Sequence, residues 1–130
     1  MAETAPTGLT WSDLQKLADD GLKRELIGGE LLVTPSPVYR HQWAAMLLSA
    51  TLLEAVQPGG GRVVQALDVV LSQHDVVQPD VCVFRAEHLS RIRDGYPRAA
   101  PDLVVEVSSP GTRRTDLGPK KDLYERYGVA

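Results

Sequence analysis

Three charged residues lie where apolar residues would be expected. Asp80 directly precedes the apolar run of residues 81–84, and Glu106 interrupts the apolar run of residues 103–107. A buried carboxylate is costly unless it is paired, protonated or bound to a metal ion. Lys120 falls within the apolar stripe of the last predicted helix, at about 100° per residue. The sequence therefore predicts that these side chains point inward and meet.

Two carboxylates and one lysine suggest a specific chemistry. Carboxylate oxygens bind hard divalent cations such as Mg²⁺ or Mn²⁺, and such a cation can activate water and stabilise charge on a phosphate. A lysine can orient or deprotonate that water and screen the developing negative charge. We therefore expect phosphodiester hydrolysis, with Asp80 and Glu106 holding the metal and Lys120 serving the water.

Each residue also has a purely structural explanation. Asp80 could cap a turn, and Glu106 could lie at the exposed end of its strand. Lys120 could extend its ammonium group to water, as long lysine side chains do. The occurrence of all three together favours a functional site over these explanations.

Helices and strands must position these residues, and the pattern predicts an α/β fold with a mixed β-sheet and flanking helices. Helices are expected at residues 9–21, with Thr10 or Ser12 as the cap, at residues 38–57, and at residues 115–128, with Thr115 as the cap. Strand hairpins are expected around Gly28 and Gly29 and between residues 62–72 and 75–84, and a further strand at residues 102–109.

The helix at residues 38–57 carries the clearest periodicity in the sequence. Its apolar stripe consists of Trp43, Met46, Leu47, Ala50 and Leu53. In the helix at residues 115–128, Lys120 lies on the helical wheel between Leu123 and Tyr124.

The bulk composition is that of one ordinary globular domain. The chain has 130 residues, 43% hydrophobic and 24% charged, and no apolar run approaches the roughly 20 residues that cross a bilayer. We therefore expect a soluble cytoplasmic protein without membrane contact. The net charge of −3 argues against a strongly basic nucleic-acid surface. Cys82, the single cysteine, excludes an internal disulfide and is expected to be buried.

Two segments resemble a known family. The segments "RELIGGELLVTPSPVYRHQ" and "VVEVSSPGTRRTDLGPKKDLYERYGV", with "QPD" between them, are similar to the restriction endonucleases often called Uma-two, a branch of the PD-(D/E)XK nuclease superfamily. The resemblance extends from about Trp11 to Ala130. It implies a restriction-endonuclease-like fold, with residues 1–8 as a flexible tail and residues 9–130 as a single nuclease-like domain.

The resemblance also implies individual roles. Asp80 matches the metal-binding aspartate and Glu106 the acidic residue of the (D/E)XK element. Ser108 stands where that element has its lysine, and Lys120 supplies the lysine from the following helix. Glu30 matches an N-terminal acidic residue expected to join the metal site.

Further expectations follow from the same resemblance. His41 and Gln42 stand where the family has a similar pair, although His41 could equally be a surface residue of its helix. Arg113, Arg114 and Lys121 are expected to contact DNA backbone phosphates. The hairpin has Gly-Gly where the family has Asp-Gly, and the family's C-terminal strands are absent, so that the fold is expected to be shortened at that end. A homodimer is expected by analogy with enzymes that cut duplex DNA.

Two other functions are compatible with the sequence. The chain could be a catalytically inactive nuclease-like module that binds DNA or a protein, because a fold does not imply an activity. It could also be a small adaptor-like α/β protein whose carboxylates are only structural.

Overall fold

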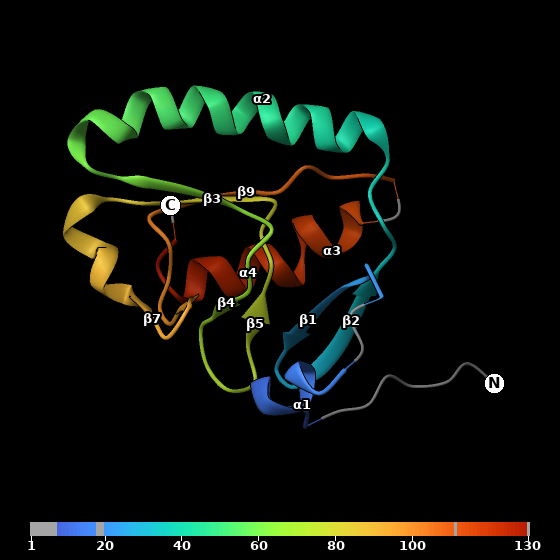
Figure 1. Ribbon diagram of the computed structural model, residues 1–130. Coiled ribbons are helices and arrows are strands. Elements are labelled where there is room, and N and C mark those ends of the chain that lie inside the picture. The colour runs from blue at the N-terminus through green and yellow to red at the C-terminus, as the bar shows by residue number, and fades with distance from the viewer. Residues whose placement is uncertain (1–7, 18–19, 111, 130) are drawn as a thin grey trace.

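A computed structural model describes residues 8–17, 20–110 and 112–129 (Figure 1). Residues 1–7, most of the predicted tail, lie outside the described residues. The first element is helix α1 (Trp11–Gln15). Thr10 caps it, since the Thr10 hydroxyl accepts a hydrogen bond from the Asp13 N–H while the Asp13 carboxylate accepts one from the Thr10 N–H. The predicted cap is confirmed.

The first hairpin forms where the sequence predicts it. Strands β1 (Lys23–Ile27) and β2 (Glu30–Thr34) pair antiparallel, with Ile27 opposite Glu30 beside the turn. Gly28 and Gly29 have φ values of +59° and +80°. A two-residue turn of this hand needs positive φ at both positions, which glycine adopts without a steric penalty.

The second predicted hairpin is divided between two sheets. Each of its two arms is broken into a pair of short strands: β3 (Arg62–Gln65) and β4 (Val69–Val70), then β5 (Val76–Val77) and β6 (Val81–Phe84). The break lies at Ala66, whose φ is +48° and whose N–H donates to the Asp80 carbonyl. Strands β4 and β5 therefore extend the first hairpin, while β3 and β6 form a separate layer.

The described strands form three small sheets. Their orders are β2-β1-β5-β4, β3-β6-β9 with β9 (Leu103–Val105), and β7-β8 with β7 (Ile92–Arg93) and β8 (Tyr96–Pro97). Two 3₁₀ turns, η1 (Gln57–Gly59) and η2 (Ala86–Arg91), connect them. The predicted α/β class is confirmed, but every pairing between described strands is antiparallel, so the expected mixture of strand directions is absent there.

Strand β6 is the centre of the core. All four of its residues are buried, as expected for a strand covered on both faces. Cys82 and Phe84 belong to the same apolar cluster as Leu123 and Tyr124 of helix α4 (Pro119–Arg126), while helix α2 (Tyr39–Val56) contacts β3 and β6 from the other side (Figure 1). Burial raises the pKa of the Cys82 thiol to about 12, so this residue packs as an apolar side chain.

The apolar stripe of α2 faces solvent rather than the sheet. Its four largest members are between 40% and 52% exposed: Trp43, Met46, Leu47 and Leu53. Ala45 and Ser49 are buried instead, and the Ser49 hydroxyl accepts a hydrogen bond from Gln65 Nε2 of β3 at 2.8 Å. The helix carries apolar residues on both sides, so periodicity alone could not identify the packed face.

The last predicted helix is two helices. Helix α3 (Arg113–Leu117) and α4 are separated by Gly118, where a Cβ atom would lie 2.9 Å from the Arg114 carbonyl oxygen. Thr115 therefore lies inside α3 and does not cap a helix, and Leu117 is 62% exposed. Pro119 is the first residue of α4, where a missing N–H costs little.

None of the helices in the described part of the chain combines the length and the apolarity that crossing a bilayer requires.

Candidate active site

Asp80 and Glu106 lie side by side because of the register between β6 and β9. These strands are antiparallel, and Val81 pairs with Val105. Asp80 directly precedes Val81, and Glu106 directly follows Val105. The two carboxylates therefore leave the same end of neighbouring strands, although they are far apart in the sequence.

Asp80 is anchored through one carboxylate oxygen and presents the other. Its Oδ2 accepts a hydrogen bond of 2.7 Å from the Val107 N–H. Its Oδ1 lies 3.2 Å from His41 Nε2 and 3.7 Å from Lys23 Nζ. Only 12% of the Asp80 side chain is exposed. His41 is thus part of the site, because α2 begins beside the end of β6.

Glu106 has the same arrangement, and its side chain is 13% exposed. Its Oε1 accepts a hydrogen bond of 2.7 Å from the Tyr124 hydroxyl and lies 2.6 Å from Lys120 Nζ. Its Oε2 lies 3.7 Å from Lys23 Nζ. Burial raises the pKa of Glu106 above its ordinary value, although the charges of Lys120 and Lys23 oppose that shift.

Lys120 is the most buried charge of the site. Its side chain is 2% exposed, and its Nζ lies 2.9 Å from Glu25 Oε2 as well as 2.6 Å from Glu106 Oε1. Desolvation lowers the pKa of Lys120, but the charges of Glu25 and Glu106 outweigh it and raise the pKa overall. Both contacts are short ion pairs, which hold the ammonium between two carboxylates.

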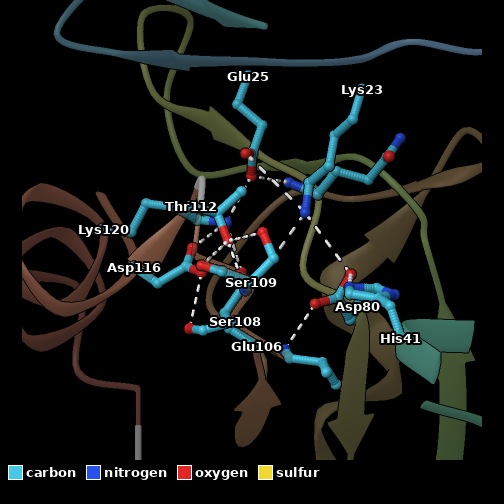
Figure 2. A network of polar contacts seen from close by, with 12 residues as sticks. Lys23, Glu25, His41, Asp80, Glu106, Ser108, Ser109, Thr112, Asp116 and Lys120 are labelled. Atoms are coloured by element: carbon cyan, nitrogen blue, oxygen red, sulfur yellow. Dashed lines mark hydrogen bonds and ion pairs between the residues drawn. The ribbon is translucent and has the colours of Figure 1, made fainter. Parts of the chain in front are cut away.

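The loop after Glu106 is tied to α3 by short polar contacts (Figure 2). The Ser108 hydroxyl donates to Asp116 Oδ2 at 2.9 Å, and the Ser109 N–H donates to Thr112 Oγ1 at 3.0 Å. Asp116 Oδ1 in turn lies 3.9 Å from Lys120 Nζ. The loop therefore fixes the end of β9 relative to the helices that deliver Lys120.

Glu25 and Lys23 belong to the site but were not identified from the sequence. Glu25 Oε2 accepts a hydrogen bond of 2.8 Å from the Gln78 N–H, and its side chain is 3% exposed. Lys23 Nζ approaches Glu25 Oε1 at 4.0 Å. Both residues point to one face of β1, since they are two positions apart. The signal that could have identified Glu25 is a carboxylate in the middle of the "KRELI" strand, the same kind of signal that identified Glu106.

The site opens into a cleft of about 580 Å³, and Figure 2 shows side chains from four parts of the chain converging there. Asp80, Glu106 and Lys120 all line it. Glu106 is therefore not at the exposed end of its strand, and Lys120 does not extend its ammonium group to water, since both side chains are largely buried.

Gln42 lines this cleft beside His41, whereas the other four predicted residues do not: Glu30, Arg113, Arg114 and Lys121. Glu30 is exposed and lies beside the turn of the first hairpin, whereas the cleft is at the opposite end of that hairpin, near Lys23. Arg113 and Arg114 are exposed and border a separate shallow depression on α3. Lys121 is exposed on α4 and lies 3.9 Å from Glu125.

The donor set suits a hard cation held by few protein ligands. Within the described ranges, no group of three or more His, Cys, Asp or Glu side chains is placed to hold a metal ion. Asp80 and Glu106, however, each direct one carboxylate oxygen at the same positive charge, that of Lys23. Mg²⁺ is usually bound by one or two carboxylates, with waters and substrate phosphate completing its shell. The chemistry of these residues fits such an ion.

Comparisons with known proteins identify the family and the fold of the chain. The model of the Uma2 family, described as "Putative restriction endonuclease", matches residues 11–130, the range over which the sequence resemblance extends. A similar solved structure is that of a putative nuclease belonging to DUF820 from Anabaena variabilis. Its TM-score is 0.78 at 22% identity, and the match covers 93% of this chain and 70% of that one. This likeness confirms the nuclease fold. Comparison with curated proteins gives no match.

Proposed function

Because the chain belongs to the Uma2 family of putative restriction endonucleases, we propose that it is a Mg²⁺- or Mn²⁺-dependent endonuclease that hydrolyses DNA phosphodiester bonds. The observation that carries the proposal is the meeting of Asp80, Glu106 and Lys120 in one cleft. Strand register and helix placement bring them together from three separate segments. A set of buried charges beside a cleft is typical of catalytic sites.

Asp80 and Glu106 would hold the cation through the oxygens that their anchoring contacts leave free, Asp80 Oδ1 and Glu106 Oε2. When bound, the cation would supply an activated water and neutralise charge on the phosphate. The Val107 N–H and the Tyr124 hydroxyl fix the orientation of the two carboxylates. Preorganised ligands of this kind need no rearrangement when substrate arrives.

Lys120 would orient the attacking water or stabilise the developing charge. Its ammonium lies 2.9 Å from Glu25 and 2.6 Å from Glu106, which leaves the third of its N–H groups for a water or a phosphate oxygen. Its raised pKa keeps it protonated, which favours a role as donor and positive charge over a role as base. Glu25 acts through Lys120 as a positioning residue.

DNA would be held mainly through its phosphates. Arg113 and Arg114 on α3 and Lys121 on α4 are exposed on the helices that also border the site. Each phosphate contact contributes to binding in a sequence-independent and salt-dependent way. Replacing Arg113 and Arg114 by Gln should weaken the binding of all duplexes alike. The slope of the logarithm of the binding constant against the logarithm of the salt concentration should become shallower by about one for each lost phosphate contact.

The function is tested by nicking of supercoiled plasmid in Mg²⁺ or Mn²⁺, with EDTA as the blank. The wild type should nick, and Asp80→Asn and Glu106→Gln should lose at least about a hundredfold in rate, an expectation based on the usual size of electrostatic terms in catalysis. Glu30→Gln is the matched control, because its carboxylate is exposed and outside the cleft. DNA binding without cleavage by the folded wild type would favour a catalytically inactive module instead.

A further inference from the structure

Three carboxylates of the site share one arrangement. One oxygen of Asp80 is anchored by a backbone N–H. One oxygen of Glu106 is anchored by a hydroxyl and Lys120, and one oxygen of Glu25 by a backbone N–H and Lys120. The other oxygen of Asp80, Glu106 and Glu25 lies 3.7, 3.7 and 4.0 Å from Lys23 Nζ respectively, and that of Asp80 also lies 3.2 Å from His41 Nε2. The Lys23 ammonium therefore marks the point on which the presented oxygens converge.

The two lysines of the cluster are held very differently. Lys120 is 2% exposed and lies within 3 Å of two carboxylate oxygens, at 2.6 and 2.9 Å. Lys23 is 20% exposed, and its nearest carboxylate oxygens lie beyond hydrogen-bond distance. It is also the first residue of β1, so its flexible stem enters the cluster from the edge of the cleft. Lys120 is fixed, whereas Lys23 can be displaced.

We propose that Lys23 is a built-in competitor of the divalent cation, an inference that rests on the metal-dependent function proposed above. A cation bound to Asp80 Oδ1 and Glu106 Oε2 needs contacts of about 2.0–2.1 Å if it is Mg²⁺. Those contacts require the space and the negative charge that the Lys23 ammonium uses. Two cations cannot share this position, so metal binding displaces Lys23 from the carboxylates.

The competition has two consequences. Lys23 offsets the repulsion among three acidic side chains before a metal binds, and it lowers the affinity of the site for the metal. Removing the lysine charge therefore leaves a more negative site that binds a divalent cation more tightly. The expected gain is about tenfold, within the usual range for coupling between two binding events.

The test is calorimetric titration of Mn²⁺ alone into the wild type, Lys23→Gln and Lys23→Met. Both variants should bind Mn²⁺ about tenfold more tightly than the wild type. Lys16→Met is the matched control and should bind like the wild type, because Lys16 is exposed at the end of α1 and outside the cleft. Equal or weaker binding by the Lys23 variants would overturn the inference.

A fourth variant separates this inference from the proposed function. Asp80→Asn should abolish Mn²⁺ binding. If the wild type binds Mn²⁺ through Asp80 but the Lys23 variants gain nothing, only the inference fails. If neither the wild type nor any Lys23 variant binds Mn²⁺, both the inference and the metal-dependent function fail.

A measurement on the unmodified chain covers the case in which the Lys23 variants do not fold. Crystals of the wild type soaked in Mn²⁺ should show an ion on Asp80 and Glu106, with Lys23 Nζ moved away from both. An ion on these carboxylates with Lys23 still 3.7 Å from each would contradict the competition.

Discussion

Lys120 Nζ lies 2.6 Å from Glu106 Oε1, and only 2% of the lysine side chain is exposed. Removing one partner of a buried ion pair leaves an uncompensated charge, at a cost of about 3 to 5 kcal/mol. Lys120→Met should therefore lower the free energy of unfolding by about that amount, measured by urea denaturation. Lys120→Met combined with Glu106→Gln should lose less than the sum of the single losses. Additive losses would show that the two charges are not coupled.

Tyr124 should orient Glu106, a role separable from its effect on stability. Tyr124→Phe removes the 2.7 Å hydrogen bond to Glu106 and should cost about 2 kcal/mol, the usual value for a bond to a charged group. Tyr127→Phe is the matched control, since it removes a 2.9 Å hydrogen bond to Asp75, which does not line the cleft. Urea denaturation should show similar losses, but only Tyr124→Phe should slow plasmid nicking. Equal nicking rates would contradict the orienting role.

The raised pKa of Glu106 predicts a pH dependence of stability. Because its folded pKa lies above the ordinary value of 4.5, Glu106 contributes fully to stability below pH 4.5 and loses that contribution as the pH rises through the folded pKa. The free energy of unfolding of the wild type minus that of Glu106→Gln should therefore fall as the pH rises above 4.5. A difference that rises with pH would mean that ion pairing, and not burial, dominates at Glu106.

Gly118 should be required for the placement of Lys120. A Cβ atom at this position would lie 2.9 Å from the Arg114 carbonyl oxygen, so α3 and α4 must move apart. Gly118→Ala should cost about 1 to 3 kcal/mol, the range for overpacking, and should slow nicking. Gly59→Ala is the control, because a Cβ there meets no atom within 4 Å. Thermal melting and nicking rates check both variants, and a Gly118→Ala protein indistinguishable from Gly59→Ala would refute the steric argument.

Local patterns allowed the fold class, the first hairpin and the cap at Thr10 to be predicted. The Gly-Gly turn and the capping box depend on residues a few positions apart, so local rules suffice. The inward position of Lys120 could also be predicted, because the helical period is preserved within α4 even though Gly118 divides the expected helix.

Long-range features could not be predicted in the same way. The packed face of α2 carries the buried Ala45 and Ser49, of which Ser49 bonds Gln65 of β3, and not the largest apolar residues of the helix. Glu25 rather than Glu30 reaches the cleft because Glu30 lies beside the turn of the first hairpin and the cleft is lined by the opposite end, near Lys23 and Thr34. Lys23 reaches Asp80 and Glu106, which are more than 50 positions away, and no local period encodes those contacts.

The central claim is that buried Lys120 and its carboxylate partners form one phosphodiester-cleaving site, and plasmid nicking by Lys120→Met tests it most directly. In saturating Mg²⁺ or Mn²⁺, folded Lys120→Met should nick at least about a hundredfold more slowly than the wild type. Lys16→Met, which alters an exposed lysine at the end of α1, should nick at the wild-type rate. Metal-dependent nicking by Lys120→Met at the wild-type rate would contradict the assignment.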